Sequence, residues 1–496
     1  MSQTNWASIL EPQEQGGNVL PMLIGGTWRT PSAETAEPVY DPATGEVLCR
    51  VAMDAAAGNY VDEAVQAAAH AFPAWRDTPA TERVQCLFRF KQLLEENFDT
   101  LARQVTVENG KTLEDARGEV RRGIEVVDFA SGMPTLMMGE TVEQIARGLD
   151  SHSVRVPLGV VAGICPFNFP VMIPLWMFPI AIAAGNTFVL KPSERTPVSG
   201  ILLAKLFSQT GAPAGVLNVV HGGRGTVDQL LQHTDVRAIS FVGSAPVAKY
   251  VYANAAATGK RVQALAGAKN HLLVMPDADL DLTVNAIMGS AFGAAGQRCL
   301  AGSVVVAVGT AGDELVPLLW KAAAQLRIGS GLQEDVAMGP LVRSEAVSRV
   351  RSYIEKGLQE GARLVLDGRS TGSQGGFFLR PSIFDHVRPD MSIAKEEIFG
   401  PVLAVIRTRD LDEALAVTNG SRFGNAASIF TRSGAAARRF RTGVETGMVG
   451  INVGVAAPMA FFPFAGWKGS FFGDLHATGK DGVRFYTESR VVVERW

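Results

Sequence analysis

Apolar residues change their spacing along the chain near residue 155. Before this point they recur every three or four positions between charged residues, which is typical of amphipathic helices. The segments with this pattern are 61–75, 80–110 and 113–133. Beyond it, continuous apolar runs alternate with helical stretches, as in a parallel sheet buried on both faces. The pattern therefore predicts an α/β domain with strands at 159–164, 187–190, 216–220 and 238–242.

A second alternation of strands and helices begins near residue 272 and predicts a second α/β domain. Its expected strands are 272–275, 304–308, 404–406 and 427–430. The tail at 482–493 carries apolar and β-branched residues without a core of its own, so we expect a strand that pairs with another subunit. A chain of 496 residues is long enough for two or three domains.

The charge balance excludes some classes of partner. With 46 basic and 49 acidic residues and a net charge of −3, no overall field attracts the chain to nucleic acid or to an anionic membrane. The segment 156–190 has no charged residue, but five prolines interrupt it, which a membrane-spanning helix would not tolerate. We interpret this segment as buried interior, and we expect neither a nucleic-acid nor a membrane partner.

The four cysteines form no CxxC motif and no cluster with histidine, which argues against a disulfide framework and against a zinc site. We therefore expect no metal. The first 28 residues contain no Lys or Arg and no apolar core segment, which is unlike a secretory signal or an Arg-rich transit peptide. Both observations favour a reducing compartment and predict a cytoplasmic protein.

Cys299 is the strongest candidate for chemistry. It lies in the stretch GAAGQRCLAG, where small neighbours leave a sulfur accessible and Arg298 places a positive charge beside it. A thiolate is a competent nucleophile, and its pKa falls beside cations. A cysteine among alanines and glycines is also common as a plain packing residue, and the stretch alone does not distinguish the two.

The strand at 238–242 ends in Gly243 and Ser244 and is followed by an expected helix at 246–257. A strand that leads through glycine into a helix N-terminus places free backbone N–H groups and the helix dipole before an anion. This arrangement is suited to a nucleotide phosphate, although an ordinary turn between a strand and a helix has the same pattern.

Several separated motifs must be considered together. In chain order they are PFNFP at 166–170, KPSE at 191–194, FVGS at 241–244, GQRC at 296–299 and EEIFGP at 396–401. This ordered set resembles the aldehyde dehydrogenase superfamily, from about residue 20 to the C-terminus. The motifs GKT at 110–112, RGEVRRG at 117–123 and GAKNH at 267–271 resemble its CoA-acylating methylmalonate-semialdehyde dehydrogenase branch.

The resemblance implies a three-part architecture. It consists of a Rossmann-like NAD-binding domain (1–131 and 151–264), an α/β catalytic domain (265–460) and a small β oligomerisation element (132–150 and 461–496). It also implies a homo-oligomer, with dimer and tetramer both open.

The resemblance assigns roles to individual residues. Cys299 would attack the aldehyde carbon, and the Asn168 side chain with the Cys299 backbone N–H would hold the oxyanion. The residues expected to bind NAD are Phe167, Lys191, Glu194, Ser244, Glu397 and Phe399. Glu194 would accept a hydrogen bond from the ribose 2′-hydroxyl and repel a 2′-phosphate, which favours NAD over NADP.

Leu265 stands where hydrolytic members carry a glutamate that activates water. Leucine cannot take a proton, so we expect coenzyme A to release the acyl group as the cosubstrate. Arg122 and Arg298 would bind the carboxylate of a small semialdehyde, malonate semialdehyde or its 2-methyl derivative. Two alternatives stay open: a hydrolytic aldehyde dehydrogenase that uses another base, and a nucleotide-binding protein of this fold without activity.

Overall fold

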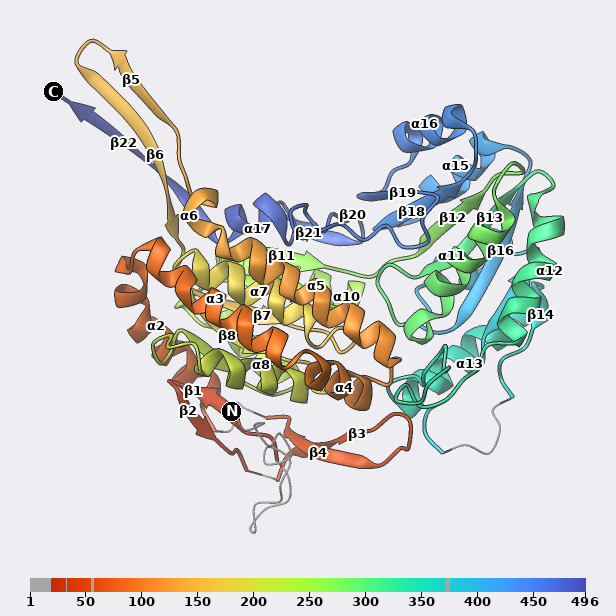
Figure 1. Ribbon diagram of the computed structural model, residues 1–496, viewed down its shortest axis with the longest axis horizontal. Coiled ribbons are helices and arrows are strands. Elements are labelled where there is room, and N and C mark those ends of the chain that lie inside the picture. Colours follow the sequence, from red (N-terminus) through yellow and green to blue (C-terminus); the bar gives the residue numbers. More distant parts are fainter. Residues whose placement is uncertain (1–18, 33, 55–57, 371–374) are drawn as a thin grey trace.

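The computed structural model describes residues 19–32, 34–54, 58–370 and 375–496. Two α/β units lie side by side, and a three-stranded arm projects from the first of them (Figure 1). The predicted α/β fold class is therefore confirmed. Residues 1–18 of the first predicted domain lie outside the described residues.

The first unit is built on an eight-stranded sheet with the order β2-β1-β9-β8-β7-β10-β11-β21. Its strands are β1 (Met22–Ile24), β2 (Thr27–Arg29), β7 (Val160–Ile164), β8 (Thr187–Lys191), β9 (Leu217–Val219), β10 (Val236–Val242), β11 (Arg261–Leu265) and β21 (Phe471–Gly473). The strands from β9 to β11 are parallel, and they include the four apolar runs predicted for the first α/β domain. In chain order this parallel part reads 3-2-1-4-5. The strand order thus reverses between β7 and β10, the place where doubly wound sheets bind ligands.

Helices cover both faces of this sheet. One face packs against α7 (Met172–Ala183) and α8 (Val198–Ser208), and α3 (Ala80–Glu96) and α5 (Leu113–Ser131) pack against these helices in a second layer. The other packs against α2 (Tyr60–Asp77), α9 (Arg224–Gln232) and α10 (Ala245–Ala257). Every residue of α7 is buried, which confirms that 156–190 is interior. Within the described part of the chain, we find no helix with the length and apolarity needed to span a membrane.

The single helix expected at 80–110 is two helices. The first, α3, ends at Glu96, and α4 (Phe98–Asn109) follows after Asn97. The Asn97 side-chain Nδ2 donates to the Leu93 carbonyl at 2.8 Å. Asparagine side chains compete with backbone donors for such carbonyls. The apolar spacing continues across the break, so periodicity alone could not reveal it. The helix expected at 113–133 is α5, and the short α6 (Met133–Leu136) comes after it.

The second unit has a seven-stranded sheet with the order β14-β15-β16-β13-β12-β18-β19, parallel except for β14. Its strands are β12 (Asn270–Val274), β13 (Gly302–Val308), β14 (Arg363–Leu366), β15 (Ser382–Asp385), β16 (Val402–Thr408), β18 (Ala426–Phe430) and β19 (Met448–Ile451). Its helices are α11 (Leu280–Phe292), α12 (Ala311–Ala324), α13 (Ser344–Gln359), α14 (Ser392–Lys395), α15 (Leu411–Asn419) and α16 (Gly434–Gly443). The 3-10 helix η1 (Gly293–Gly296) leads into the loop that carries Cys299.

The arm joins segments that are far apart in sequence. It consists of β5 (Thr141–Ala146), β6 (Leu149–Pro157) and β22 (Thr487–Arg495), and the C-terminus lies near its tip (Figure 1). The first part of the predicted tail strand is instead the helix α17 (Gly479–Phe485). β22 pairs with β6 of its own chain, so its outer edge has no strand partner among the described residues. Pairing of that edge with another subunit stays a prediction.

The predicted boundaries of the oligomerisation element do not coincide with the strands that form the arm. The boundary at residue 150 falls inside β6. Within 461–496, β21 belongs to the first sheet, and β20 (Trp467–Lys468) pairs with β17 (Phe423–Gly424). The remaining strands, β3 (Ala36–Tyr40) and β4 (Val47–Ala52), form a separate hairpin.

Candidate active site

A cavity of about 810 Å³ opens at the carboxyl ends of β7, β8 and β10. This is the end of the sheet, and the reversal of strand order, at which a ligand is expected. The predicted site residues that line the cavity are Phe167, Asn168, Lys191, Glu194, Ser244, Cys299, Glu397 and Phe399. Arg122 and Arg298 are not among its lining residues. The fold thus brings together eight of the predicted residues, which come from both α/β units.

A strained turn and two amides hold the loop of Cys299. Ala294 and Ala295 in η1 have positive φ angles of 49° and 52°, a conformation that non-glycine residues adopt rarely. The Asn270 Nδ2 donates to the Cys299 carbonyl at 2.9 Å, and the Asn425 Nδ2 donates to the same oxygen at 2.8 Å. These bonds fix the backbone of the loop, so the direction of the sulfur is set by the second unit.

The environment of Cys299 opposes ionisation of its thiol. The residue is only partly exposed, and burial raises the pKa of the thiol to about 12. The carboxylate of Glu397 is the second cause of the rise, and Arg298 contributes the weakest effect in the opposite direction. Arg298 thus lowers the pKa of the thiol, as expected from the sequence, but burial and Glu397 outweigh it. Its guanidinium forms an ion pair with Asp115, which opposes its positive charge.

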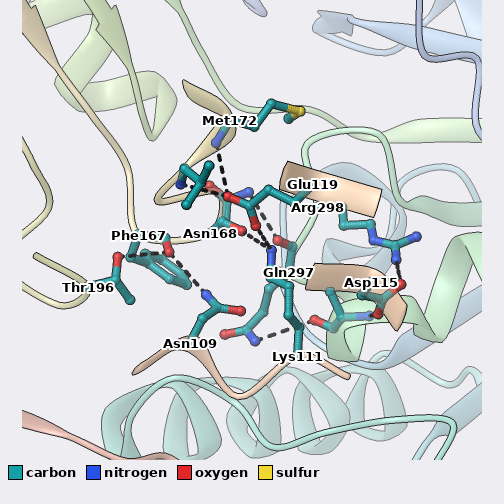
Figure 2. A network of polar contacts seen from close by, with 12 residues as sticks. Asn109, Lys111, Asp115, Glu119, Phe167, Asn168, Met172, Thr196, Gln297 and Arg298 are labelled. Carbon is teal, nitrogen blue, oxygen red and sulfur yellow. Dashed lines mark hydrogen bonds and ion pairs between the residues drawn. The ribbon is translucent and has the colours of Figure 1, made fainter. Parts of the chain in front are cut away.

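Asn168 lies in the loop that follows β7, and it is buried. Its Nδ2 donates to the carbonyl of Gln297 at 3.0 Å, two residues before Cys299 (Figure 2). An amide nitrogen carries two hydrogens, so one donor of Asn168 is left for a ligand in the cavity. The oxyanion position predicted from the sequence requires exactly such a free donor beside the sulfur.

The two arginines are not among the residues that line the cavity. Arg298 donates to Asp115 of α5 and to the Gly289 carbonyl at 3.3 Å. Arg122, also from the α5 helix, donates to Glu125 at 3.1 Å and to the Met459 sulfur at 2.8 Å. Arg298 is therefore bound to the helix that carries Arg122, but the two guanidinium groups have different hydrogen-bond partners and do not form one clamp.

A model of the aldehyde dehydrogenase family matches residues 28–492. The chain belongs to this family. Malonate-semialdehyde dehydrogenase 2 of Geobacillus thermodenitrificans is 57% identical over 478 residues, which cover 96% of this chain and 99% of the relative. The malonate-semialdehyde dehydrogenase of Halalkalibacterium halodurans is 54% identical, with 97% and 99% covered.

Solved structures of aldehyde dehydrogenases agree with this fold. The methylmalonate-semialdehyde dehydrogenase of Oceanimonas doudoroffii is 47% identical and superposes with a TM-score of 0.94, covering 97% of this chain and 98% of that one. An aldehyde dehydrogenase of Bacillus cereus, solved as a complex with NAD+, is 31% identical with a TM-score of 0.93, covering 100% and 99%.

The residues predicted to hold NAD in this aldehyde dehydrogenase form a chemically suitable set. The Lys191 Nζ donates to Glu194 Oε2 at 3.0 Å. Burial, the largest single influence, raises the pKa of Glu194, but the charge of Lys191 together with hydrogen bonds to the carboxylate and the charge of Arg195 leaves the pKa below its usual value. Ser244 is the N-cap of α10 and its side chain makes no capping bond, so the first N–H groups of that helix are open to a phosphate. The donors and the carboxylate fit a dinucleotide with a free 2′-hydroxyl.

The other end of the cavity carries aromatic rings and Glu397. Phe167 and Phe399 meet edge to face with centroids 5.8 Å apart, and Phe399 has a positive φ of 55°. Glu397 accepts the Ala268 N–H at 2.9 Å, and burial raises the pKa of its carboxyl. A strained aromatic residue beside a fixed carboxylate gives this end a rigid shape.

Leu265 ends β11, where hydrolytic aldehyde dehydrogenases have their glutamate. Its side chain is 5% exposed and belongs to the same apolar cluster as Leu300, against which Cys299 packs. Among the described residues that line the cavity, the carboxylates are Glu194, Glu345 and Glu397. Leu265 itself is not among the lining residues of the cavity; its neighbour Ala266 is, and Leu265 lies behind it in the apolar cluster.

Sequence reasoning gave no role to several residues of this site. Figure 2 shows that Lys111, Asp115, Glu119 and Gln297 join Asn168 and Arg298 in one polar network. Three of them come from α5 or the turn before it, where charged residues at helical spacing look like an ordinary solvated face. The sequence did not indicate that Lys111 and Glu119 are buried, and this burial is what distinguishes them from a solvated face. Separately, we find no group of three or more potential metal-binding side chains in the described ranges.

Proposed function

We propose that this aldehyde dehydrogenase oxidises malonate semialdehyde or its 2-methyl derivative with NAD and transfers the acyl group to coenzyme A. The products are acetyl-CoA or propionyl-CoA and CO2. The observation that carries the proposal is that Cys299 and the NAD-type residues line one cavity, while position 265, buried in the apolar cluster against which Cys299 packs, is a leucine. Relatives named malonate-semialdehyde dehydrogenase, at 57% and 54% identity, support the choice of substrate.

Cys299 acts as the nucleophile. Its thiol releases the proton to solvent, the sulfur forms a bond to the aldehyde carbon, and the π electron pair of the carbonyl moves onto the oxygen. The free N–H of the Asn168 amide and the Cys299 backbone N–H stabilise that oxyanion. Bound NAD supplies the acceptor for the hydride that leaves this carbon. The carbon–oxygen double bond then re-forms, and Cys299 carries the acyl group as a thioester.

The thioester persists until coenzyme A arrives. Activation of water by a positioned base contributes about 10²–10⁴-fold, and Leu265 cannot provide it. The thiol of coenzyme A needs no strong base to attack the thioester, because an appreciable fraction of it is already thiolate near neutral pH. Thiolysis regenerates the Cys299 thiol and gives an acyl-CoA. A carboxylate β to the thioester leaves as CO2 when its bond to the α-carbon breaks, with the electron pair delocalised into the thioester carbonyl before the carbon is protonated.

Arg122 and Arg298 are the proposed ligands of the substrate carboxylate. Asp115 already neutralises Arg298, so Arg122 has to supply much of the attraction. Its ion pair with Glu125 spans three residues of one helix and its side chain is 39% exposed. Such an exposed pair stabilises little, and a substrate carboxylate can replace it.

We further propose that the enzyme is a cytoplasmic homo-oligomer, either a dimer or a tetramer. The arm supports this proposal because it exposes apolar side chains on its strands. These are Val142, Ile145, Val491 and Val493, with between 54% and 67% of their surface exposed. Contact with a second subunit would remove this surface from water.

The test is a single-turnover reaction with excess enzyme, NAD and malonate semialdehyde, with and without coenzyme A. We expect one equivalent of NADH in both cases, a Cys299-bound acyl group without coenzyme A, and acetyl-CoA in the mass spectrum after its addition. The Cys299→Ser variant should form no NADH. Fast release of free acid without coenzyme A would instead favour the hydrolytic alternative, with Glu397 as the nearest candidate base.

A further inference from the structure

We propose that Lys111 and Glu119 are a positioning pair that fixes the oxyanion donor Asn168. The Lys111 Nζ lies 2.6 Å from Glu119 Oε2 and 2.6 Å from the backbone carbonyl of Asn168 (Figure 2). Both charged side chains are buried, with 1% and 0% of their surface exposed. The third direction of the ammonium group faces the Phe169 ring, 4.2 Å from its centroid. Every donor direction of Lys111 is thus used, and one holds the backbone of Asn168.

Glu119 ties this ammonium group to the start of α7. Its Oε1 accepts the N–H of Val171 at 2.8 Å and that of Met172 at 3.1 Å. A carboxylate that accepts the first N–H groups of a helix satisfies donors that have no partner inside it. The loop of Asn168 is therefore fixed from both sides of the same ion pair, by its own carbonyl and by the helix that follows.

The side chain of Asn168 is fixed by a second route, through Gln297. Its Nδ2 donates to the Gln297 carbonyl, and the Gln297 Oε1 accepts the Val342 N–H at 3.1 Å. Gln297 stands two residues before Cys299, in the loop that carries the sulfur. A continuous chain of contacts from Glu119 through Lys111 and Asn168 to this loop therefore sets the place of the amide relative to the nucleophile.

Stability does not explain why this pair is ionic. The desolvation of two buried charges costs several kcal/mol per ion, and apolar replacements of such pairs are often neutral or stabilising. Geometry gives a better reason, because a reacting group displaced by about 1 Å can cost about 10²-fold in rate. This inference rests on the role of Asn168 in the proposed function, and it adds that Lys111 acts on the reaction only through Asn168.

A double-mutant cycle tests this statement. The rate of the NADH burst with malonate semialdehyde and NAD is measured in the full-length enzyme and in Lys111→Met, Asn168→Ala and the double variant. Loss of one oxyanion donor costs about 10²–10³-fold, and we expect Lys111→Met to lose about 10- to 10²-fold. The double variant should be no slower than Asn168→Ala, because residues that act as a unit are not additive. The Kd for NAD should not change.

Lys91→Met is the matched control. Lys91 pairs with Asp128 at 2.6 Å, but its side chain is 35% exposed and lies on α3, away from Asn168. Its burst rate should equal that of the unaltered enzyme. If Lys111→Met does not fold, Glu119→Gln replaces it in the cycle, because the amide oxygen can still accept an N–H of α7 while the charge is lost.

The outcomes separate this inference from the proposed function. An unaltered burst in Asn168→Ala would overturn both. A slow Asn168→Ala with an unaltered Lys111→Met, or losses that multiply in the double variant, would overturn the positioning role alone. Loss of the melting transition in Asn168→Ala and in both pair variants would assign the network to folding and would also reject the positioning role.

Discussion

The thiol of Cys299 should react slowly with alkylating agents in the free enzyme. Only the thiolate reacts, and burial followed by the charge of Glu397 raises the pKa of this thiol to about 12. At about pH 8 such a thiol is roughly 10⁻⁴ ionised, whereas an ordinary cysteine is roughly one quarter ionised. Alkylation should therefore be about a thousandfold slower than that of free cysteine. Because the charged form is disfavoured, the rate should rise about tenfold with each pH unit until the pKa is approached.

The assay is the first-order rate of iodoacetamide labelling between about pH 6 and pH 10, followed by mass spectrometry of the peptide that carries the label. Cys299→Ser gives the background from the three other cysteines, all of which are buried. Removing the negative charge by Glu397→Gln should move the profile to lower pH. A plateau at or below about pH 8.5, the range of an unperturbed thiol, would refute the argument from burial.

Two further predictions concern the acyl group and the substrate. Leu265→Glu should speed hydrolysis of the acyl enzyme without coenzyme A by at least about tenfold, since a positioned base contributes about 10²–10⁴-fold; an unchanged free-acid yield would show that residue 265 does not control it. Arg122→Ala and Arg298→Ala should lower kcat/KM for malonate semialdehyde by about 10- to 10²-fold and leave propanal nearly unaffected, as expected for lost charge-assisted hydrogen bonds. Equal losses on both substrates would reject the carboxylate ligands.

The parallel sheets could be predicted from the sequence because burial on both faces leaves a simple signature. A strand such as β8 has no polar face, so its apolar run is uninterrupted and stands out from the helices. The break at Asn97 had no such signature. The Leu93 carbonyl accepts both the side chain and the backbone N–H of Asn97, and the apolar spacing runs through the break.

The site shows the same difference between local pattern and distant contact. Cys299 and Ser244 could be proposed from their own neighbours, because a nucleophile and a phosphate turn are short motifs. The ion pair of Arg298 could not be predicted in this way, because its partner Asp115 lies 183 residues away in sequence. Sequence proximity suggested a cation that lowers the pKa of the thiol, whereas the fold pairs that cation with Asp115 and adds burial and the charge of Glu397, which raise the pKa.

A single helix face connects these contacts. Asp115, Glu119 and Arg122 lie at positions i, i+4 and i+7 of α5, which a helix places on one side. The first neutralises Arg298 beside the nucleophile, the second holds the ammonium group that contacts the Asn168 backbone, and the third presents a guanidinium group near Met459. A rotation of α5 would therefore alter the oxyanion donor and the proposed carboxylate ligand together. For this reason substrate recognition and acylation in this enzyme should respond jointly to changes on α5, although α5 does not carry the sulfur.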